Sequence, residues 1–230
     1  MCDRRIGAAV LGVSMVDAVQ QRVSMVDSQV RPSDVTDRRI IRAMLQVPRE
    51  NFVPAGREAL AYADNDVPVA SGRALLAPRT FAKLVQLADV GDRDRVLVVG
   101  CGTGYGAAVL QIMGAEVTAL EADAGLLSTA KEQTERCANG VRVVQGALSE
   151  GWAANAPYDA ILVEGAVAAA PDALLSQLKD GGRLVAVLSA ANGGRAILWR
   201  RSGQVYGETF GFDAAAGLLP GFARAPAFAL

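Results

Sequence analysis

The stretch "VLVVGCGTGYGAAVL", residues 96–110, sets alternating glycines between a Val-rich run and an Ala-rich run. The Val-rich run predicts a buried strand, and the Ala-rich run predicts a helix. At such a junction the free backbone N–H groups of the helix N-terminus point at whatever lies above them, and glycine lets a ligand come close to the backbone. The stretch therefore predicts a strand–turn–helix unit of an α/β fold, with a ligand site at the turn.

The chain after residue 94 alternates strand-like and helical runs. "RVLVVG", "EVTALE", "VRVVQG" and "YDAILVEG" are strand-like, "PDALLSQL" predicts a helix, and "RLVAVLS" predicts a further strand after the turn "KDGG". This alternation predicts a Rossmann-like, mostly parallel sheet with helices on both faces. The run "RAILWRRSGQVYGETF" predicts a β-hairpin across Ser202 and Gly203, which would add an antiparallel edge.

Two helices are predicted upstream of this region. One lies in "SDVTDRRIIRAMLQVP", where Ser33 or Asp34 can cap the N-terminus and Pro48 ends the helix. The other opens at Pro78 and stops at Gly91, after a loop-rich connection. We expect an N-terminal helical extension that packs on the α/β part.

No linker divides the chain. We therefore expect residues 1–90 to form the helical extension and a substrate-side segment, and residues 91–230 to form the α/β domain, in one compact unit. With 230 residues, 51% of them hydrophobic, the chain can bury a sizeable core.

The charge balance excludes several kinds of partner. Lys and Arg together number 23 against 24 Asp and Glu, so the composition favours neither a nucleic-acid nor an anionic-membrane partner. No stretch reaches the roughly 18 apolar residues of a membrane span. The three cysteines, Cys2, Cys101 and Cys137, lack a CxxC spacing, which favours a reducing compartment, and we expect a cytoplasmic protein.

The first residues mimic a secretory signal, because Arg4 and Arg5 precede a short apolar run. Asp17 interrupts the region where a cleavage site should lie, which argues against a signal. Met15 and Met25 are alternative starts to Met1.

The chain has no histidine. This absence excludes His-based general base catalysis, Ser–His and Cys–His catalytic groups and the usual zinc ligand sets. Nothing in the sequence predicts a metal site.

Glu121 supplies the second half of the ligand signal. It ends the second strand-like run, about 20 residues after the glycine loop, where a carboxylate can accept both hydrogen bonds of a ribose diol. Tyr105 stands where the dinucleotide fingerprint GxGxxG requires glycine, which argues against NAD or FAD and leaves a nicotinamide oxidoreductase as a remote alternative. A GxGxG loop with a later acidic residue is the pattern of S-adenosylmethionine-dependent methyltransferases. A glycine-rich turn without a ligand is the plain alternative.

From about Met25 to its end, the sequence resembles the protein-L-isoaspartate O-methyltransferase family. The matching blocks are "MVDSQVRPSDVTDRRIIRAMLQVPRENFVP", "LAYADNDVP", "VLVVGCGTGYGAAVLQIMGAEVTALE", "APYDAILVEGA" and "LLSQLKDGGRLVAV". The resemblance implies a seven-stranded methyltransferase sheet and a methyl transfer from S-adenosylmethionine, which leaves S-adenosylhomocysteine. It also implies a role in protein repair, with a protein or peptide substrate that carries the free carboxylate of an isoaspartyl residue.

The glycine loop and the resemblance together give a set of expected cofactor-binding residues. They comprise the loop, the acidic residue after the second strand and the turn after the third strand: Gly100, Cys101, Gly102, Thr103, Gly104, Tyr105, Glu121, Gly146 and Ala147.

The sequence departs from the family pattern on the substrate side and around the cofactor. Where the family has Gly-Gln-Thr-Ile-Ser before a proline, this chain has "GRALLAP", so that Ala74 replaces the Thr and Leu76 replaces the Ser. Val98 stands where the family has an acidic residue before the loop, Ala147 where it has the Asp that meets adenine, and Phe81 roughly where a His often follows. The catalytic residues are therefore not identified by the resemblance.

Arg73 and Glu164 are the candidates for replacing the missing polar groups. Arg73 could pair with a substrate carboxylate, with a surface arginine as the alternative. Glu164 could accept a hydrogen bond from the cofactor or from a substrate amine, with a solvated loop carboxylate as the alternative. Cys101 is expected to serve as a small residue of the loop rather than as a nucleophile, since it has no His partner.

Methylation of a carboxylate suits a chain without histidine. A carboxylate has a pKa near 4, so it is ionised at pH 7 and needs no base to attack a sulfonium methyl group. The leading hypothesis is an isoaspartate O-methyltransferase. The alternatives are a methyltransferase with a different acceptor, motivated by "GRALLAP", and a non-catalytic protein of the same fold that binds the cofactor or acts through protein contacts.

Overall fold

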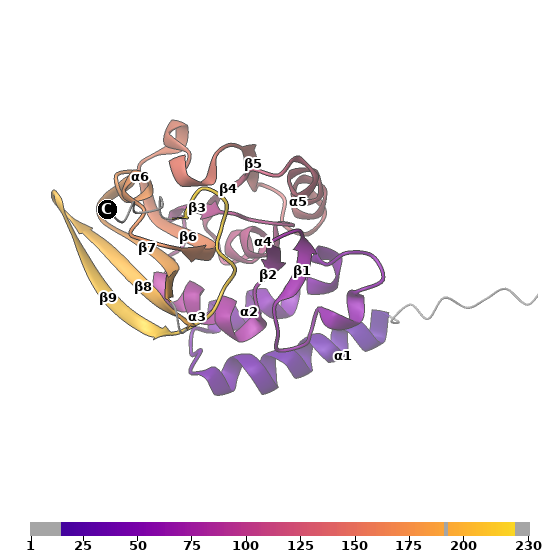
Figure 1. Ribbon diagram of the computed structural model, residues 1–230. Helices are drawn as coiled ribbons and strands as arrows, with labels where there is room; N and C mark the ends of the chain where they lie inside the picture. Colours follow the sequence, from indigo (N-terminus) through magenta and orange to yellow (C-terminus); the bar gives the residue numbers. More distant parts are fainter. Residues whose placement is uncertain (1–14, 191–192, 224–230) are drawn as a thin grey trace, which may run out of the picture.

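The central element of the computed structural model, which describes residues 15–190 and 193–223, is a seven-stranded sheet (Figure 1). Its strand order is β5-β4-β3-β6-β7-β8-β9. The strands are β3 (Arg95–Val99), β4 (Glu116–Glu121), β5 (Arg142–Gln145), β6 (Tyr158–Val167), β7 (Leu178–Ala190), β8 (Gly193–Ser202) and β9 (Val205–Asp213). The first five strands in this order, β5, β4, β3, β6 and β7, run parallel to their neighbours. Strand β8 pairs antiparallel with β7 and with β9. The expected sheet and its hairpin across Ser202 and Gly203 are thus confirmed.

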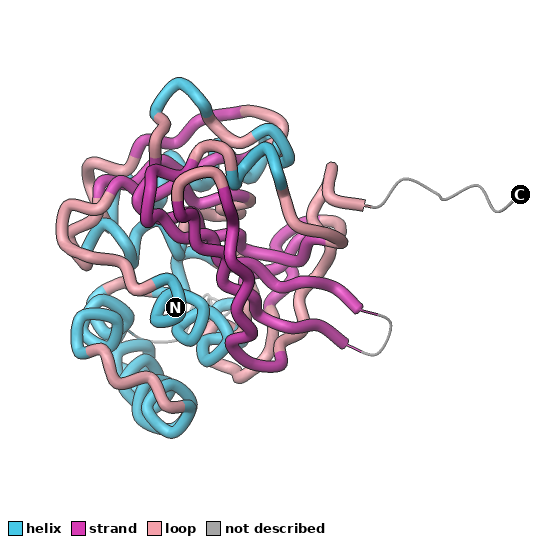
Figure 2. Tube along the Cα trace, turned by 90° about the vertical axis from the view of Figure 1, so that its left-hand side faces the viewer, coloured by secondary structure: helices cyan, strands magenta, loops and turns pink. Residues whose placement is uncertain are grey.

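Most helices lie on one face of this sheet. The helices are α1 (Met15–Met25), α2 (Arg38–Gln46), α3 (Pro78–Ala88), α4 (Tyr105–Ile112), α5 (Ala124–Cys137) and α6 (Asp172–Leu175). Figure 2 shows the N-terminal helices gathered on one side of the twisted sheet. Because α3 packs directly on β6 and β7, the N-terminal segment shares the core of the sheet.

The alternation of side chains along β3 creates two hydrophobic layers. Val96 and Val98 point into the layer that α2, α3 and α4 cover, whereas Leu97 and Val99 point into the opposite layer. All four are fully buried, as expected for a parallel strand covered on both faces. Val98, where the resemblance implies an acidic residue, is thus a core residue.

The second face is covered mainly by elements other than long helices. The short helix α6, two 3₁₀ turns at Leu148–Glu150 and Ala153–Asn155, and the chain around Leu219 and Phe222 pack there. The helix predicted in "PDALLSQL" is shorter than expected because β7 already begins at Leu178, so the predicted turn "KDGG" lies within that strand.

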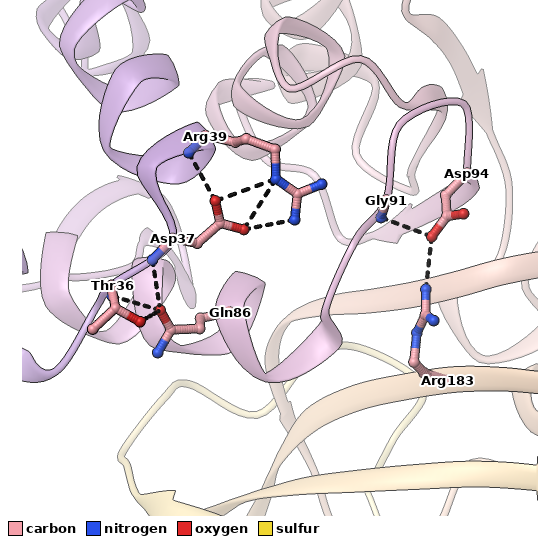
Figure 3. A network of polar contacts seen from close by, with 7 residues as sticks. All are labelled: Thr36, Asp37, Arg39, Gln86, Gly91, Asp94 and Arg183. Atoms are coloured by element: carbon pink, nitrogen blue, oxygen red, sulfur yellow. Dashed lines mark hydrogen bonds and ion pairs between the residues drawn. The ribbon is translucent and has the colours of Figure 1, made fainter.

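Helix α2 begins later than predicted. Its N-cap is Asp37, whose carboxylate accepts a hydrogen bond of 2.7 Å from the backbone N–H of Arg39 (Figure 3). Ser33 donates instead to the carbonyl of Gln29, and Asp34 has a φ of +62°, outside the extended conformation of an N-cap. Helix α3 opens at Pro78 as predicted, but its C-cap is Asp89, with a φ of +49°, rather than Gly91.

Two polar links fix the helices, one between α2 and α3 and one between the loop after α3 and the sheet, as Figure 3 shows. Gln86 on α3 accepts hydrogen bonds from the backbone N–H groups of Thr36 (2.7 Å) and Asp37 (3.2 Å), which holds the start of α2 against α3. Asp94 accepts a hydrogen bond from Gly91 N–H (2.9 Å) and pairs with Arg183 on β7 (2.6 Å).

The connection between α2 and α3, predicted as loop-rich, contains a small hairpin. Strands β1 (Val67–Ala70) and β2 (Arg73–Leu75) pair antiparallel and form a sheet of their own, separate from the central one. This hairpin carries the divergent segment "GRALLAP" toward the carboxyl ends of the central strands.

Replacing Gly104 by Ala should destabilise the protein by about 2–4 kcal/mol, because the residue has a φ of +95° and a Cβ would lie 2.9 Å from Thr134 Cγ2 on α5. Gly56 is the matched control, since it has a φ of +82° but no atom within 4 Å of its Cβ position. Gly56→Ala should therefore cost about 1 kcal/mol, from the backbone alone. Urea unfolding of both variants measures the difference, and equal losses would contradict the packing role of Gly104.

Candidate cofactor site

The glycine loop occupies the turn between β3 and α4, at the carboxyl end of the sheet. The backbone N–H groups of Gly100 and Cys101 donate to the carbonyl of Leu120 on β4, at 2.9 and 3.1 Å. Gly100, Gly102 and Gly104 all have positive φ, so the backbone conformation of the loop by itself favours glycine at these positions.

The loop glycines face different surroundings. Gly102 faces open space, as expected for a position that a ligand approaches. Gly104 packs against α5, so this glycine serves the contact between helices. Above Gly100 lie the side chains of Leu219 and Arg73, 2.9 and 3.2 Å from the position of a Cβ.

Glu121 lies at the end of β4, beside this loop, and is paired with Arg73. The guanidinium donates to both carboxylate oxygens, at 2.6 Å from Nη1 to Oε1 and 2.9 Å from Nη2 to Oε2. A third hydrogen bond of 3.0 Å runs from Arg73 Nη2 to the carbonyl of Gly100. Both side chains are buried, with 7% of the Arg73 side chain and none of the Glu121 side chain exposed.

The backbone supplies three further donors to Glu121. The N–H of Gly102 donates to Oε2 at 2.8 Å, and those of Ala122 and Asp123 donate to Oε1 at 2.9 and 3.1 Å. A carboxylate accepts about four hydrogen bonds, so both oxygens are saturated. In this structure Arg73 and the three backbone groups together occupy the hydrogen-bonding positions of the Glu121 carboxylate.

The structure corrects both interpretations of Arg73. Arg73 is not a surface residue, and its guanidinium binds a carboxylate of this chain rather than standing free for a substrate. Leu76, at the position of the family's Ser, is 4% exposed and belongs to the hydrophobic core.

Glu164 is buried within β6, which continues to Val167, so the interpretation as a solvated loop carboxylate is wrong. Its Oε1 lies against Gly106 in the first turn of α4, close to the ring of Phe81. Burial raises the pKa of Glu164 from its usual 4.5 to about 8, although the charges of Arg73 and Arg49 oppose the shift.

A buried polar cluster lies behind the loop and was not predicted. Arg49 is fully buried, donates to the carbonyls of Ala61 (2.7 Å) and Leu76 (2.6 Å), and lies 4.7 Å from the centre of the Tyr105 ring. Arg49 Nη1, the Tyr105 hydroxyl and Glu164 Oε1 are buried polar atoms without a hydrogen-bond partner. A charged residue alone predicts a solvated position, so the sequence carried no sign of this cluster.

The remaining candidates lie in or beside the loop. The ring of Tyr105 packs in the core between Phe52 and Phe81, at 5.5 and 5.3 Å between centres, so its side chain faces away from the turn. Thr103 donates through its hydroxyl to the carbonyl of Phe52 (2.6 Å), which ties the loop to the N-terminal segment. Cys101 is buried, and burial together with the charge of Glu121 raises the pKa of its thiol well above its usual value, as suits a small loop residue.

The turn after β5 lies next to Glu121. The N–H of Gly146 donates to the backbone carbonyl of Glu121 at 3.1 Å, and Ala147 is exposed. The structure thus brings the loop, Glu121 and Gly146 together at the carboxyl ends of three neighbouring strands. Their contacts with a cofactor stay a prediction.

Comparisons with known proteins define the class of fold, which is the Rossmann-like methyltransferase fold. A solved protein-L-isoaspartate O-methyltransferase superposes with a TM-score of 0.77 at 24% identity, covering 87% of this chain and 66% of that chain. A Plasmodium falciparum protein described as a protein-L-isoaspartate O-methyltransferase, in complex with S-adenosyl-L-homocysteine, gives a TM-score of 0.73 at 18% identity and covers 88% of this chain and 97% of that one. These likenesses show the fold.

The sequence itself shows the family. The family model "Protein-L-isoaspartate(D-aspartate) O-methyltransferase (PCMT)" matches residues 20–205. The protein-L-isoaspartate O-methyltransferase of Koribacter versatilis is 40% identical over 165 residues, which cover 71% of this chain and 74% of the relative. That of Methylorubrum populi is 38% identical over 189 residues, covering 82% and 88%. The chain belongs to this family, and it is an S-adenosylmethionine-dependent methyltransferase.

Among the described residues, no helix is long and apolar enough to cross a membrane.

The raised pKa of Glu164 predicts a pH-dependent stability. Since the folded protein binds this proton more tightly than the unfolded chain, the contribution of Glu164 is fully present below pH 4.5 and is lost as the pH rises through about 8. The loss amounts to several kcal/mol, because one pKa unit corresponds to about 1.4 kcal/mol. Glu164→Gln keeps the shape of the side chain but replaces the carboxyl group by an amide, which does not titrate.

Urea unfolding of the wild type and Glu164→Gln between pH 5 and pH 9 measures this effect. We expect the free energy of unfolding to fall with pH more steeply in the wild type than in the variant. Equal slopes in the two proteins would show that Glu164 does not carry a shifted proton.

Proposed function

We propose that this protein transfers a methyl group from S-adenosylmethionine to the free carboxylate of isoaspartyl residues in damaged proteins, as a repair enzyme of the cytoplasm. One observation carries the proposal: the Gly100–Gly104 loop and Glu121 meet at the carboxyl ends of β3 and β4, in a chain that belongs to the isoaspartate methyltransferase family. In open α/β sheets this edge is where ligands bind.

The proposed roles follow from these positions. Glu121 would accept the hydrogen bonds of the ribose, and Gly146 would lie beside the base. Gly102 would lie closest to S-adenosylmethionine, because it alone of the loop glycines faces open space. The donor supplies a methyl group on a positively charged sulfur. An ionised carboxylate is sufficient as the nucleophile, so the chain's residues need only align the two reactants and keep water away.

The substrate side favours a second candidate for the acceptor. Leu76 lies in the core and Ala74 carries no hydroxyl, so two polar groups that the family associates with its substrate have no counterpart at these positions. A carboxylate in a different chemical setting is therefore the alternative acceptor, with the same donor and the same fold.

The test of the proposed function is methyl transfer to paired peptides. Purified protein is incubated with methyl-labelled S-adenosylmethionine and either an isoaspartyl peptide or the same peptide with a normal aspartyl residue. We expect base-labile methyl ester on the isoaspartyl peptide alone. Label on neither peptide, with label on other proteins or carboxylic acids, would favour the second acceptor.

Gly102→Asn tests the proposed position of the donor. Asparagine tolerates the φ of +56° at this position, and its side chain would enter the open space above the loop. We expect the affinity for S-adenosylhomocysteine, measured by calorimetry, to fall at least about tenfold, or about 1.4 kcal/mol. Gly56→Asn, with a φ of +82° and open surroundings, is the matched control and should bind as the wild type does. Undiminished binding by Gly102→Asn would place the donor elsewhere.

A further inference from the structure

Arg73 occupies the positions that a ribose diol needs on Glu121. Of the five donors around the carboxylate, three are backbone N–H groups, those of Gly102, Ala122 and Asp123. These three belong to the glycine loop and to the turn after β4, so they cannot leave while the two turns keep their shape. The other two donors are the Nη1 and Nη2 groups of Arg73, and these can be exchanged for two hydroxyl groups.

The pairing is strong and specific. A bidentate hydrogen-bonded pair between arginine and a carboxylate is stronger than neutral hydrogen bonds, and burial removes the competition of water. The third bond from Arg73 to the carbonyl of Gly100 fixes the guanidinium over the loop. The protein must therefore break this pair before a ligand can bind Glu121, so the apparent affinity for that ligand is lower than it would be without Arg73.

A second segment closes the space above Gly100 from the other side. The chain after β9 pairs with the end of β6, through Ala166 N–H to the carbonyl of Gly217 (2.8 Å) and Leu219 N–H to the carbonyl of Ala166 (3.0 Å). This pairing sets the side chain of Leu219 against Gly100 and Gly165. The guanidinium of Arg73 thus lies beside the side chain of Leu219 above Gly100, and this contact helps to hold it in place.

The position of Arg73 in the fold allows it to move. Strands β1 and β2 form a separate two-stranded sheet, and the turn between them, Ser71 and Gly72, is exposed. Arg73 is the first residue of β2 after this turn. The guanidinium can therefore withdraw with the tip of the hairpin, or by rotation of the side chain, without breaking a hydrogen bond of the central sheet.

We propose that Arg73 is a built-in competitor for the ribose subsite: in the free protein it closes the subsite by pairing with Glu121, and the nucleoside of the donor binds only when Arg73 withdraws. This inference rests on the proposed function, since it takes Glu121 as the residue that binds the ribose. Arg73 then determines the affinity for S-adenosylmethionine, and any change that favours the withdrawn hairpin raises that affinity.

Calorimetric titration with S-adenosylhomocysteine tests this directly. The proteins are the wild type, Arg73→Gln and Arg79→Gln, in which Arg79 is an exposed arginine of the same part of the chain whose partner, Asp64, is also partly exposed. We expect Arg73→Gln to bind at least about tenfold more tightly than the wild type, and Arg79→Gln to bind equally. Ligand should also raise the melting temperature of Arg73→Gln more than that of the wild type.

Arg73→Lys keeps the proposal testable if the loss of the buried cation prevents folding of Arg73→Gln. Lysine retains the charge but not the two-pronged pairing, so its affinity for S-adenosylhomocysteine should lie above that of the wild type. Binding by the wild type with equal or weaker binding by the Arg73 variants would overturn this inference and leave the proposed function standing. Binding by none of the proteins at millimolar ligand would contradict the proposed function, and the inference with it.

Discussion

The ion pair between Arg73 and Glu121 connects the two parts of the chain at the ligand edge of the sheet. It joins β2, which precedes the central sheet in the sequence, to the end of β4, and it reaches the glycine loop through Gly100. The three backbone N–H groups of Gly102, Ala122 and Asp123 also bind the Glu121 carboxylate, and only the group that takes the place of Arg73 can change. The state of the site therefore depends on which donor it has, the guanidinium or, in the proposed complex, the hydroxyl groups of a ribose.

Much of the fold could be predicted because it depends on local patterns. The β-branched runs predicted the parallel strands, and the hairpin expected across Ser202 and Gly203 predicted the antiparallel edge. The positions of the loop and of Glu121 followed from the same patterns, since consecutive parallel strands end at one edge of a sheet. Glu121 is buried at that edge, where it pairs with Arg73.

The partners of the charged residues could not be predicted because they come from distant parts of the chain. Arg73 and Glu121 are 48 residues apart, and only the hairpin β1–β2 brings them together. Arg49 and Glu164 lie in a core that the N-terminal segment and β6 build jointly. The cap of helix α2 is a smaller example, because Ser33, Asp34 and Asp37 all suit an N-cap by residue type, and only the backbone conformation singles out Asp37.

A crystal structure of the protein with S-adenosylhomocysteine tests the central claim most directly. The account predicts that the ribose hydroxyl groups bind Glu121 and that the guanidinium of Arg73 has left it, while the N–H of Gly102 keeps its place. A complex in which Arg73 remains paired with both oxygens of Glu121, with the ligand bound beside the pair, would contradict it.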